Sequence, residues 1–320
     1  MKKISLITLI LIVLMFSWTL FKPLETKPEP ANFICLDLKQ GEFSQLPELS
    51  GTVYGIGLSY ADHIEETASN YSPESSPPIF IKSSSSILRG GGQVLIPTSK
   101  QLIHSLDTIE PGLGAQLNQS HPQLPAMLDY EVELAYVVLE DIHPSELIDD
   151  QFLPKLGFTV VNDLSARSLI FMGEGQLNRY DYWGLSKSFK GFTPIANDLW
   201  IPDRQQINGI PCVTLKTTVN GVLRQSQNTS NMIYTPLQTL RFISVRYTNR
   251  EFKAGDIIAT GTPGGVVMKA PKWKVRLSTL LKLDRFTKLN AVIGQTGFLQ
   301  SGDKIITSAQ GLSSVEVSLK

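Results

Sequence analysis

The sequence predicts a β-rich mixed α/β fold of the α+β type, preceded by one N-terminal transmembrane helix. Three observations lead to this prediction. From about residue 50 onward, short apolar runs alternate with Gly, Pro, Asn and Asp, which is the spacing of strands and turns. Long amphipathic helical patterns are scarce over the same part of the chain. The N-terminus, by contrast, holds one long apolar run without a charged residue.

Residues 1–22 are expected to form a membrane anchor or a signal sequence. Lys2 and Lys3 precede the apolar run Ile4–Phe21, which as a helix would span about 27 Å, close to the bilayer core of about 30 Å. No small-residue cleavage site follows, so an uncleaved anchor is favoured over a cleaved signal. The lysine pair predicts a domain outside the cytoplasm. Cleavage would instead give a secreted or periplasmic protein. Proline-rich residues 23–50 are expected to be a tether and lead-in.

Composition is that of an ordinary globular protein, and nothing in it suggests nucleic-acid binding. The chain has 320 residues, of which 42% are hydrophobic and 18% charged, and its net charge is zero. Residues 51–320 are expected to form the main folded domain, with surface insertions near 99–125 and 269–289. The two cysteines have no metal-ligand spacing. Two separate thiols are favoured, and a disulfide is left open for a domain outside the cytoplasm.

The first candidate site is a pair of carboxylates in the run that begins at Asp129. If this run is a strand, Glu131 and Glu133 share one face, because side chains alternate along a strand. Two neighbouring carboxylates repel each other in a half-buried site, and a hard divalent cation would remove the repulsion. Asp163 follows the next apolar run and is a candidate third ligand. The alternatives are a solvated sheet edge for the pair and a helix N-cap for Asp163.

Further candidates are weak one by one. His63 and Glu66 are i, i+3 neighbours on an expected short helix, so the carboxylate could orient the imidazole as a general base. The glycine-rich turn around Thr262 could bind an anion through backbone N–H groups and the hydroxyl. Lys187, between aromatic and small residues, could stabilise an enolate. A solvent-facing pair, a plain tight turn and a surface lysine are the respective alternatives.

The order of these motifs along the chain resembles the fumarylacetoacetate hydrolase family. The series G-x-x-Y-x-x-H-x-x-E, F-x-K, D-Y-E-x-E-L, N-D-x-S-x-R, K-S-F and G-D-x-I-x-T-G-T-P-x-G runs from about Val53 to Val266. The resemblance implies the family's β-rich fold, a homodimer, and Mg²⁺ or Mn²⁺ in the site, with Ca²⁺ as a further possibility. It implies three groups of site residues. They are the metal ligands Glu131, Glu133 and Asp163, the catalytic residues His63, Glu66 and Lys187, and the substrate-binding residues Tyr60, Arg167, Lys187 and Thr262.

The same resemblance implies a metal-dependent hydrolase that cleaves a C–C bond in an acylpyruvate-like or other 1,3-dicarbonyl acid. A decarboxylase, isomerase or hydratase acting on a 2-oxo acid would use the same site, and a membrane-held binding protein without activity is the third possibility. Three departures from the family pattern bear on specificity. Ile170 stands where a glutamine is common, and Ser186 stands where a glycine usually precedes the lysine. Ser83 follows the lysine of F-x-K, where a proline is common.

Overall fold

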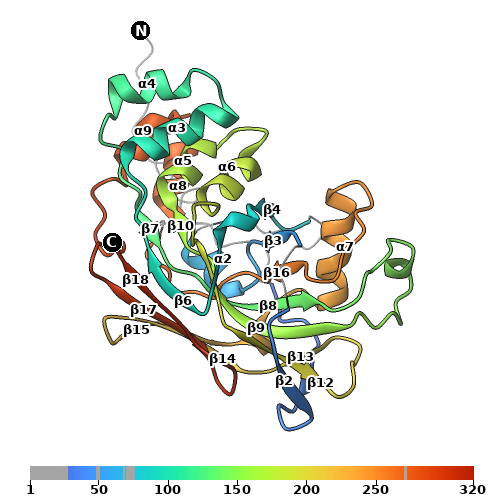
Figure 1. The fold of residues 1–320 in the computed structure, drawn as a ribbon. Helices are drawn as coiled ribbons and strands as arrows, with labels where there is room; N and C mark the ends of the chain where they lie inside the picture. Colours follow the sequence, from blue (N-terminus) through green and yellow to red (C-terminus); the bar gives the residue numbers. More distant parts are fainter. Residues whose placement is uncertain (1–27, 48–50, 68, 70–75, 270–271) are drawn as a thin grey trace, which may run out of the picture.

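The computed structural model describes residues 28–47, 51–67, 69, 76–269 and 272–320. Within them, nine strands form the larger sheet, in the order β2-β12-β9-β8-β16-β3-β4, with β11 pairing to β9 and β5 to β11 (Figure 1). The bounds along this sheet are Gly41–Gln45 (β2), Asp198–Pro202 (β12), Leu156–Asn162 (β9), Val132–Val138 (β8), Ile257–Ala259 (β16), Val53–Ile56 (β3), Ile79–Lys82 (β4), Thr193–Ile195 (β11) and Ile87–Arg89 (β5).

A second sheet packs against the first. Among the described residues it contains five strands, in the order β15-β14-β17-β18-β6. Their bounds are Val222–Asn228 (β15), Thr214–Val219 (β14), Lys304–Ala309 (β17), Val315–Leu319 (β18) and Gly91–Val94 (β6). Between the sheets, Val132 and Val160 pack with Leu215 and Ala309 in one buried apolar cluster. Two small pairs complete the strands: Ile34–Leu36 (β1) with Gly209–Pro211 (β13), and Leu128–Asp129 (β7) with Ser165–Ala166 (β10). The β-rich mixed fold is therefore confirmed.

Most helices gather at one end of the sheets, where α3, α4, α5, α6 and α9 lie together in Figure 1. The α-helices within the described residues are Ala61–Glu66 (α2), Ser99–Ile109 (α3), Leu113–Ser120 (α4), Arg167–Gly173 (α5), Arg179–Ser186 (α6), Pro236–Arg246 (α7), Lys272–Leu280 (α8) and Arg285–Asn290 (α9). The sequence sets the start of α7 clearly. Thr235 and Gln238 form a capping box, and Pro236 occupies the first turn, where its missing N–H costs nothing.

Residues 99–125, expected to be a surface insertion, instead contribute to the core. They form α3 and α4, and α3 begins with a capping box between Thr98 and Gln101. The apolar residues at helical spacing are buried in the largest cluster, and they are Leu102, Ile103, Leu106, Leu113 and Leu117. The Gln, Ser and Gly residues between them give the segment the composition of a loop, which makes the helical spacing hard to recognise. The second predicted insertion, 269–289, holds α8 and most of α9.

The predicted anchor at Ile4–Phe21 lies outside the described residues. Among the residues that the structure does describe, no helix has the length and apolar character needed to cross a bilayer.

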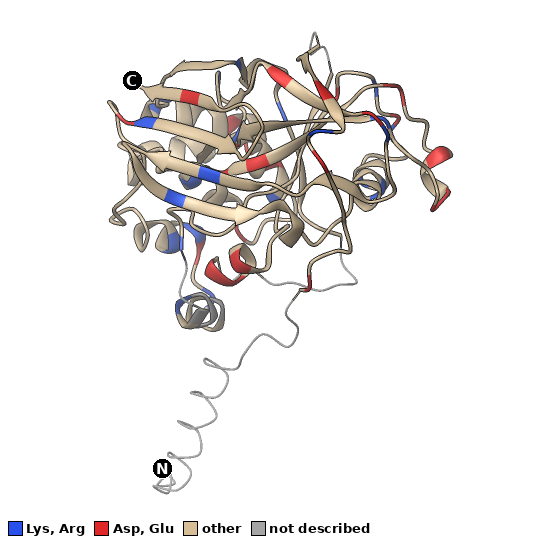
Figure 2. Cartoon of the chain, turned by 90° about the horizontal axis from the view of Figure 1, so that it is seen from below, with Lys and Arg blue, Asp and Glu red and all other residues tan. Residues whose placement is uncertain are grey.

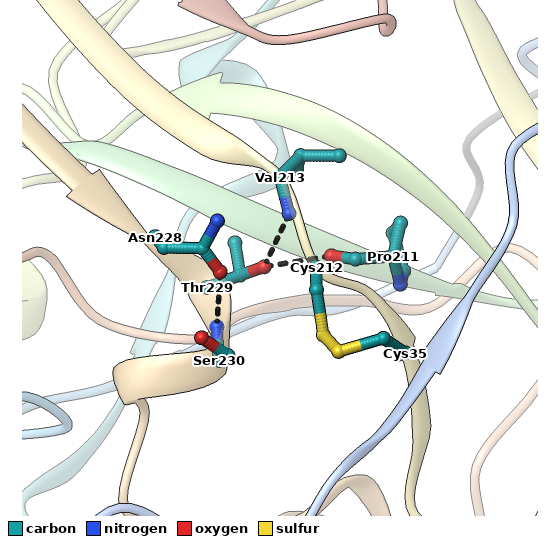
Figure 3. The surroundings of a disulfide bond; sticks show 7 residues. All are labelled: Cys35, Pro211, Cys212, Val213, Asn228, Thr229 and Ser230. Atoms are coloured by element: carbon teal, nitrogen blue, oxygen red, sulfur yellow. Dashed lines mark hydrogen bonds between the residues drawn. A yellow bond between two sulfur atoms is a disulfide. The ribbon is translucent and has the colours of Figure 1, made fainter.

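The two cysteines form a disulfide, so the expectation of two separate thiols is wrong (Figure 3). Strand β1 pairs in parallel with β13, which places Cys35 beside Cys212 with their Cα atoms 5.0 Å apart. Thr229 fixes the other side of this junction, since its hydroxyl donates to the Pro211 carbonyl and accepts the Val213 N–H. The bond joins residues 177 positions apart. In a loop-closure treatment, such a cross-link stabilises the fold by about 5 kcal/mol.

Candidate active site

Three carboxylates come together where β8 begins and β9 ends. Glu131, Glu133 and Asp163 are all buried, and one ligand oxygen from each lies within 4.8 Å of the others. The strand register explains this meeting. Val132 pairs with Asn162, so Glu131 and Asp163 lie opposite each other, joined by a 2.8 Å hydrogen bond from the Asp163 N–H to the Glu131 carbonyl. Glu133 is two residues further along and therefore points to the same face as Glu131.

Neither alternative for these residues fits the structure. Glu133 is 2% exposed, so the pair is not a solvated sheet edge. The N-cap of α5 is Ala166, so Asp163 does not cap that helix. A short strand, β10, separates Asp163 from the first helical residue, Arg167.

Two buried lysines hold Asp163. The ammonium of Lys187 lies 2.6 Å from Asp163 and 2.7 Å from Glu131. Lys82 forms an ion pair with the other oxygen of Asp163 and donates a second hydrogen bond to the Phe192 carbonyl. The burial of Lys187 opposes its charge, but the two carboxylates outweigh that effect and raise its pKa. The Phe80 ring covers the same ammonium, with Nζ 5.3 Å from the ring centroid.

Arg167 holds Glu131 from the other side. Its guanidinium contacts Asp129 through Nε at 2.9 Å and Glu131 through a second nitrogen at 2.6 Å. Asp129 in turn accepts the backbone N–H groups of Val267 and Met268, which follow the glycine-rich turn. Burial opposes ionisation of Glu131, but Arg167 and Lys187 outweigh it and hold its pKa at about 2.

Among the carboxylates of this buried network, Glu133 is the one that no cation of the described residues contacts. Its Oε2 accepts the Gly261 N–H at 2.8 Å, and its pKa is raised well above the usual value by burial, then by the charges of Asp163 and Glu131. With all four carboxylates ionised, the described network would hold four negative and three positive charges, and this excess opposes ionisation of Glu133. Such an all-oxygen donor set fits a hard divalent cation, whose positive charge would favour the ionised form of Glu133.

The His63–Glu66 pair forms as expected, on helix α2. Nδ1 of His63 lies 2.9 Å from Glu66 Oε1, and both side chains are largely buried. The imidazole is close enough to Glu131 for its charge to help lower the pKa of that carboxyl. Since Nδ1 is engaged with Glu66, the other ring nitrogen, Nε2, faces no competing hydrogen bond from the described part of the chain. A histidine oriented in this way can accept a proton.

The glycine-rich turn binds carboxylates of the protein itself. The Gly261 N–H donates to Glu133, and the Gly265 N–H donates to both oxygens of Glu66, at 3.1 and 2.9 Å. Gly261 has a φ of +94°, and a Cβ there would lie 2.5 Å from the Ser59 hydroxyl, so the turn needs glycine. The hydroxyl of Thr262 donates to the Val132 carbonyl and accepts a hydrogen bond from Gln225. A substrate-binding role for Thr262 stays a prediction.

Tyr60 precedes α2 as its N-cap residue. The side chain is fully buried in the apolar cluster that also contains Tyr136 and Met232. Its hydroxyl has no hydrogen-bond partner among the described residues, and burial, followed by the charges of Tyr136 and Glu133, raises its pKa. Its role in substrate binding likewise stays a prediction.

Two residues of the network were not assigned a role from the sequence. Lys82 is the lysine of the quoted F-x-K motif, and Asp129 is the first residue of D-Y-E. The sequence feature that could point to Lys82 is an apolar run ending in a lysine. A lysine at the end of a buried strand needs an acidic partner, because a buried ammonium is costly without one. The identity of that partner depends on the packing of residues 81 positions apart.

Comparison with known proteins decides the family. The family model described as "Fumarylacetoacetate (FAA) hydrolase C-terminal" matches residues 52–320. The chain belongs to the fumarylacetoacetate hydrolase family. The enzymes of this family depend on divalent metals. The buried cluster of Glu131, Glu133 and Asp163 agrees with a metal site of that kind.

Relatives within the fumarylacetoacetate hydrolase family catalyse different reactions. An uncharacterised protein of Archaeoglobus fulgidus is 30% identical over 250 residues, covering 75% of this chain and 82% of the relative. An oxaloacetate tautomerase of Bacillus subtilis is 30% identical over 224 residues, covering 69% and 61% of the two chains. A bifunctional isomerase/decarboxylase of 4-hydroxyphenylacetate degradation from Salmonella dublin is 29% identical, and only 42% of it is covered.

Solved structures of the fumarylacetoacetate hydrolase family share the fold. A putative family member from Yersinia pestis gives a TM-score of 0.54 at 25% identity, covering 84% of this chain and 93% of that one. A 5-carboxymethyl-2-hydroxymuconate delta-isomerase from Mycobacterium smegmatis gives a TM-score of 0.52 at 22% identity, covering 86% and 80%.

Proposed function

We propose that this chain is a divalent-metal-dependent hydrolase that cleaves a C–C bond in an acylpyruvate-like or other 1,3-dicarbonyl acid. The observation that carries the proposal is the position of the His63–Glu66 pair beside the buried carboxylates. His63 does not form an ion pair with Glu131 or Asp163, whereas Lys187 is held by both. The site therefore combines a cation-binding set with a separate base.

Glu131, Glu133 and Asp163 would hold Mg²⁺ or Mn²⁺, and Ca²⁺ also accepts such oxygen ligands. When bound, the cation supplies Lewis-acid polarisation of a substrate carbonyl. His63, oriented by Glu66, takes a proton from water, and the water oxygen bonds to the distal carbonyl carbon. The C–C bond then breaks, and its electron pair stays on the pyruvate part as an enolate. Lys187 lies where it offsets that negative charge, and the proton on His63 returns to the enolate carbon.

A tautomerase or decarboxylase is the second candidate. The tautomerase relative at 30% identity supports it, because enolisation of oxaloacetate needs a proton moved between carbon and oxygen. His63 could move that proton without attack by water. A non-catalytic binding protein is the third possibility, and the buried His63–Glu66 pair argues against it, because binding alone does not need a base.

A substrate panel separates these reactions. The purified protein, loaded with Mg²⁺ or Mn²⁺, would be mixed with acylpyruvates and with oxaloacetate. A hydrolase is expected to remove the enol absorbance of an acylpyruvate and release pyruvate and a carboxylic acid in equal amounts. Release of CO₂ from oxaloacetate, or interconversion of its enol and keto forms alone, would replace the hydrolase proposal with the second candidate.

We further propose that the domain lies outside the cytoplasm, held by residues 1–22. The disulfide supports this location, because disulfides persist in oxidising compartments. Full-length protein is expected to sediment with membranes and to resist extraction by high salt, and protein lacking residues 1–30 is expected to stay in the supernatant. A full-length protein found soluble, with a mature N-terminus beyond Phe21, would show a cleaved signal instead.

The mass of the detergent-solubilised protein tests the homodimer implied by the family resemblance.

A further inference from the structure

Helix α8 carries an apolar stripe that faces solvent. Trp273, Leu277 and Leu280 stand at i, i+4 and i+7, and Leu281 follows at i+8, so the four side chains share one face. Leu281 continues the helix, because its N–H donates to the Leu277 carbonyl. In a globular protein such a face normally packs on the core. Here Trp273, Leu280 and Leu281 are 42%, 54% and 57% exposed, so this α8 stripe remains open to solvent in the described structure.

The segment that follows the α8 stripe is fixed to the body of the domain. Arg285 donates two hydrogen bonds of 2.6 Å to the Glu110 carboxylate, one to each oxygen. Asp284 caps α9 by accepting the Phe286 N–H, and Leu289 is buried in the largest apolar cluster. The stripe is therefore held at the surface by a docked helix, and its exposure is a property of the folded domain.

Basic residues accompany the α8 stripe. Residues 269–289 contain seven lysines and arginines and one acid, and basic residues still outnumber acidic ones by seven to four when the three acids of α2 are included. Lys274 and Lys282 are exposed, and Lys274 Nζ lies 5.7 Å from the centre of the Trp273 ring. Large apolar residues beside lysines are typical of a helix that lies on an anionic lipid surface. A two-fold contact of the stripe with itself would instead bring two basic segments together.

The described chain begins close to the start of this segment. The Ala31 N–H donates to the Met232 carbonyl, and Met232 pairs with Tyr60, the residue before α2. Lys269 Nζ lies 3.8 Å from the carboxylate of Glu66, the last residue of α2. The two places thus adjoin opposite ends of a helix about 9 Å long. In Figure 2 the acidic helix α2 lies at the surface on the lower side of the molecule, and the described chain begins on that side.

This arrangement keeps α8 near the membrane that is proposed to hold the chain. Seven chain steps separate Phe21, the end of the apolar run, from Pro28, the first described residue. Even a fully extended chain of that length reaches at most about 25 Å. The side of the domain that carries α2 and the start of the basic segment is therefore the side closest to the bilayer.

We propose that the α8 stripe rests on the surface of an anionic lipid bilayer, with Trp273, Leu280 and Leu281 among the headgroups and Lys274 and Lys282 beside the lipid phosphates. The inference goes beyond the proposed reaction and rests on the proposed location at a membrane. Residues 1–22 keep the helix close to the lipid, so a contact too weak to retain the domain by itself is sufficient. The contact sets the orientation of the domain and holds α2 close to the bilayer.

The test places a polarity-sensitive dye on the stripe. Cys35 and Cys212 are the two native cysteines, and the disulfide joins them, so Leu281→Cys gives the full-length protein one free thiol. The labelled protein would be reconstituted into phosphatidylcholine vesicles, with or without phosphatidylglycerol. In the anionic vesicles the dye emission is expected to shift to the blue and to be quenched by nitroxide-labelled lipid. In the neutral vesicles both effects are expected to be smaller.

Matched variants make the result specific. The combination of Lys274→Glu with Lys282→Glu is expected to abolish the blue shift, whereas Lys216→Glu, at an exposed position on β14, is expected to leave it unchanged. Ser318→Cys carries the control dye on β18, next to the C-terminus, which Figure 2 shows on the upper side of the molecule. Its emission is expected to be the same in both kinds of vesicle. Equal shifts at residues 281 and 318 would overturn the proposal.

Separate readouts distinguish this proposal from that of the N-terminal anchor. Sedimentation with neutral vesicles at high salt tests the anchor, and the dye shift tests the stripe. Sedimentation without a dye shift in anionic vesicles would overturn the stripe contact alone. A shift that is equal in both vesicles and grows with the amount of protein per vesicle would assign the stripe to a second copy of the chain and would also overturn the contact. A shift in anionic vesicles by protein that does not sediment with neutral ones would support the contact and overturn the anchor.

Discussion

Glu133→Ala is expected to abolish both divalent-metal binding and turnover while the fold persists. Glu133 is the carboxylate with no cation in contact among the described residues, and its charge is destabilised by burial and by Asp163 and Glu131. Removing it takes one ligand from the cation without leaving a buried lysine or arginine unpaired. Calorimetry with Mn²⁺ and Mg²⁺ measures the affinity, and circular dichroism measures the fold.

Two further variants make this result specific. Glu133→Gln keeps an oxygen that can accept the Gly261 N–H but loses the charge, so it is expected to fail in metal binding with less disturbance of the turn. Glu140→Ala removes an exposed carboxylate, 61% accessible and paired with Lys155, and is expected to change neither property. Metal affinity equal to that of the wild type in Glu133→Ala would falsify the metal-site hypothesis.

His63→Ala is expected to lower the rate of hydrolysis by about 10²–10⁴, the usual range for loss of a general base. Metal affinity is expected to remain nearly intact, because the imidazole is not one of the three clustered carboxylate ligands. The rate under saturating substrate and the Mn²⁺ affinity are the two readouts. Together they distinguish a base from a metal ligand.

The matched control for this variant is His104→Ala, because His104 is exposed on α3. Glu66→Gln tests the orientation of the imidazole. It keeps a side chain that can accept from Nδ1, but it removes the charge that favours the protonated ring. A smaller loss than in His63→Ala is therefore expected. Full turnover in His63→Ala would leave this residue with a structural role only.

The parts of the site that follow from local periodicity could be predicted from the sequence. The two-residue repeat of a strand places Glu131 and Glu133 on one face, and the i, i+3 spacing joins His63 to Glu66. Contacts across the fold could not be predicted in this way. The ion pair of Lys82 with Asp163 depends on β4 and the end of β9 being brought together by packing at α6 and β11.

Two other differences have distinct physical causes. Helix α3 is hard to recognise in the sequence, because its apolar residues, Leu102, Ile103 and Leu106, lie among polar residues typical of loops. The disulfide does not follow from the sequence, which favours two separate thiols. A cross-link needs Cα atoms within bridging distance, and the parallel pairing of β1 with β13 brings them there. No spacing rule in the sequence encodes that pairing.

The Cys35–Cys212 bond also determines how the chain would behave when cut. It closes a covalent ring, and His63, the three clustered carboxylates and Lys187 all lie on this ring, whereas the glycine-rich turn lies beyond it. A single proteolytic nick between the two cysteines would leave both fragments joined, so the cut protein would migrate as one species until a thiol reductant separated the pieces. A nick after Cys212 would release the C-terminal fragment, with its part of the site, under denaturing conditions without any reductant.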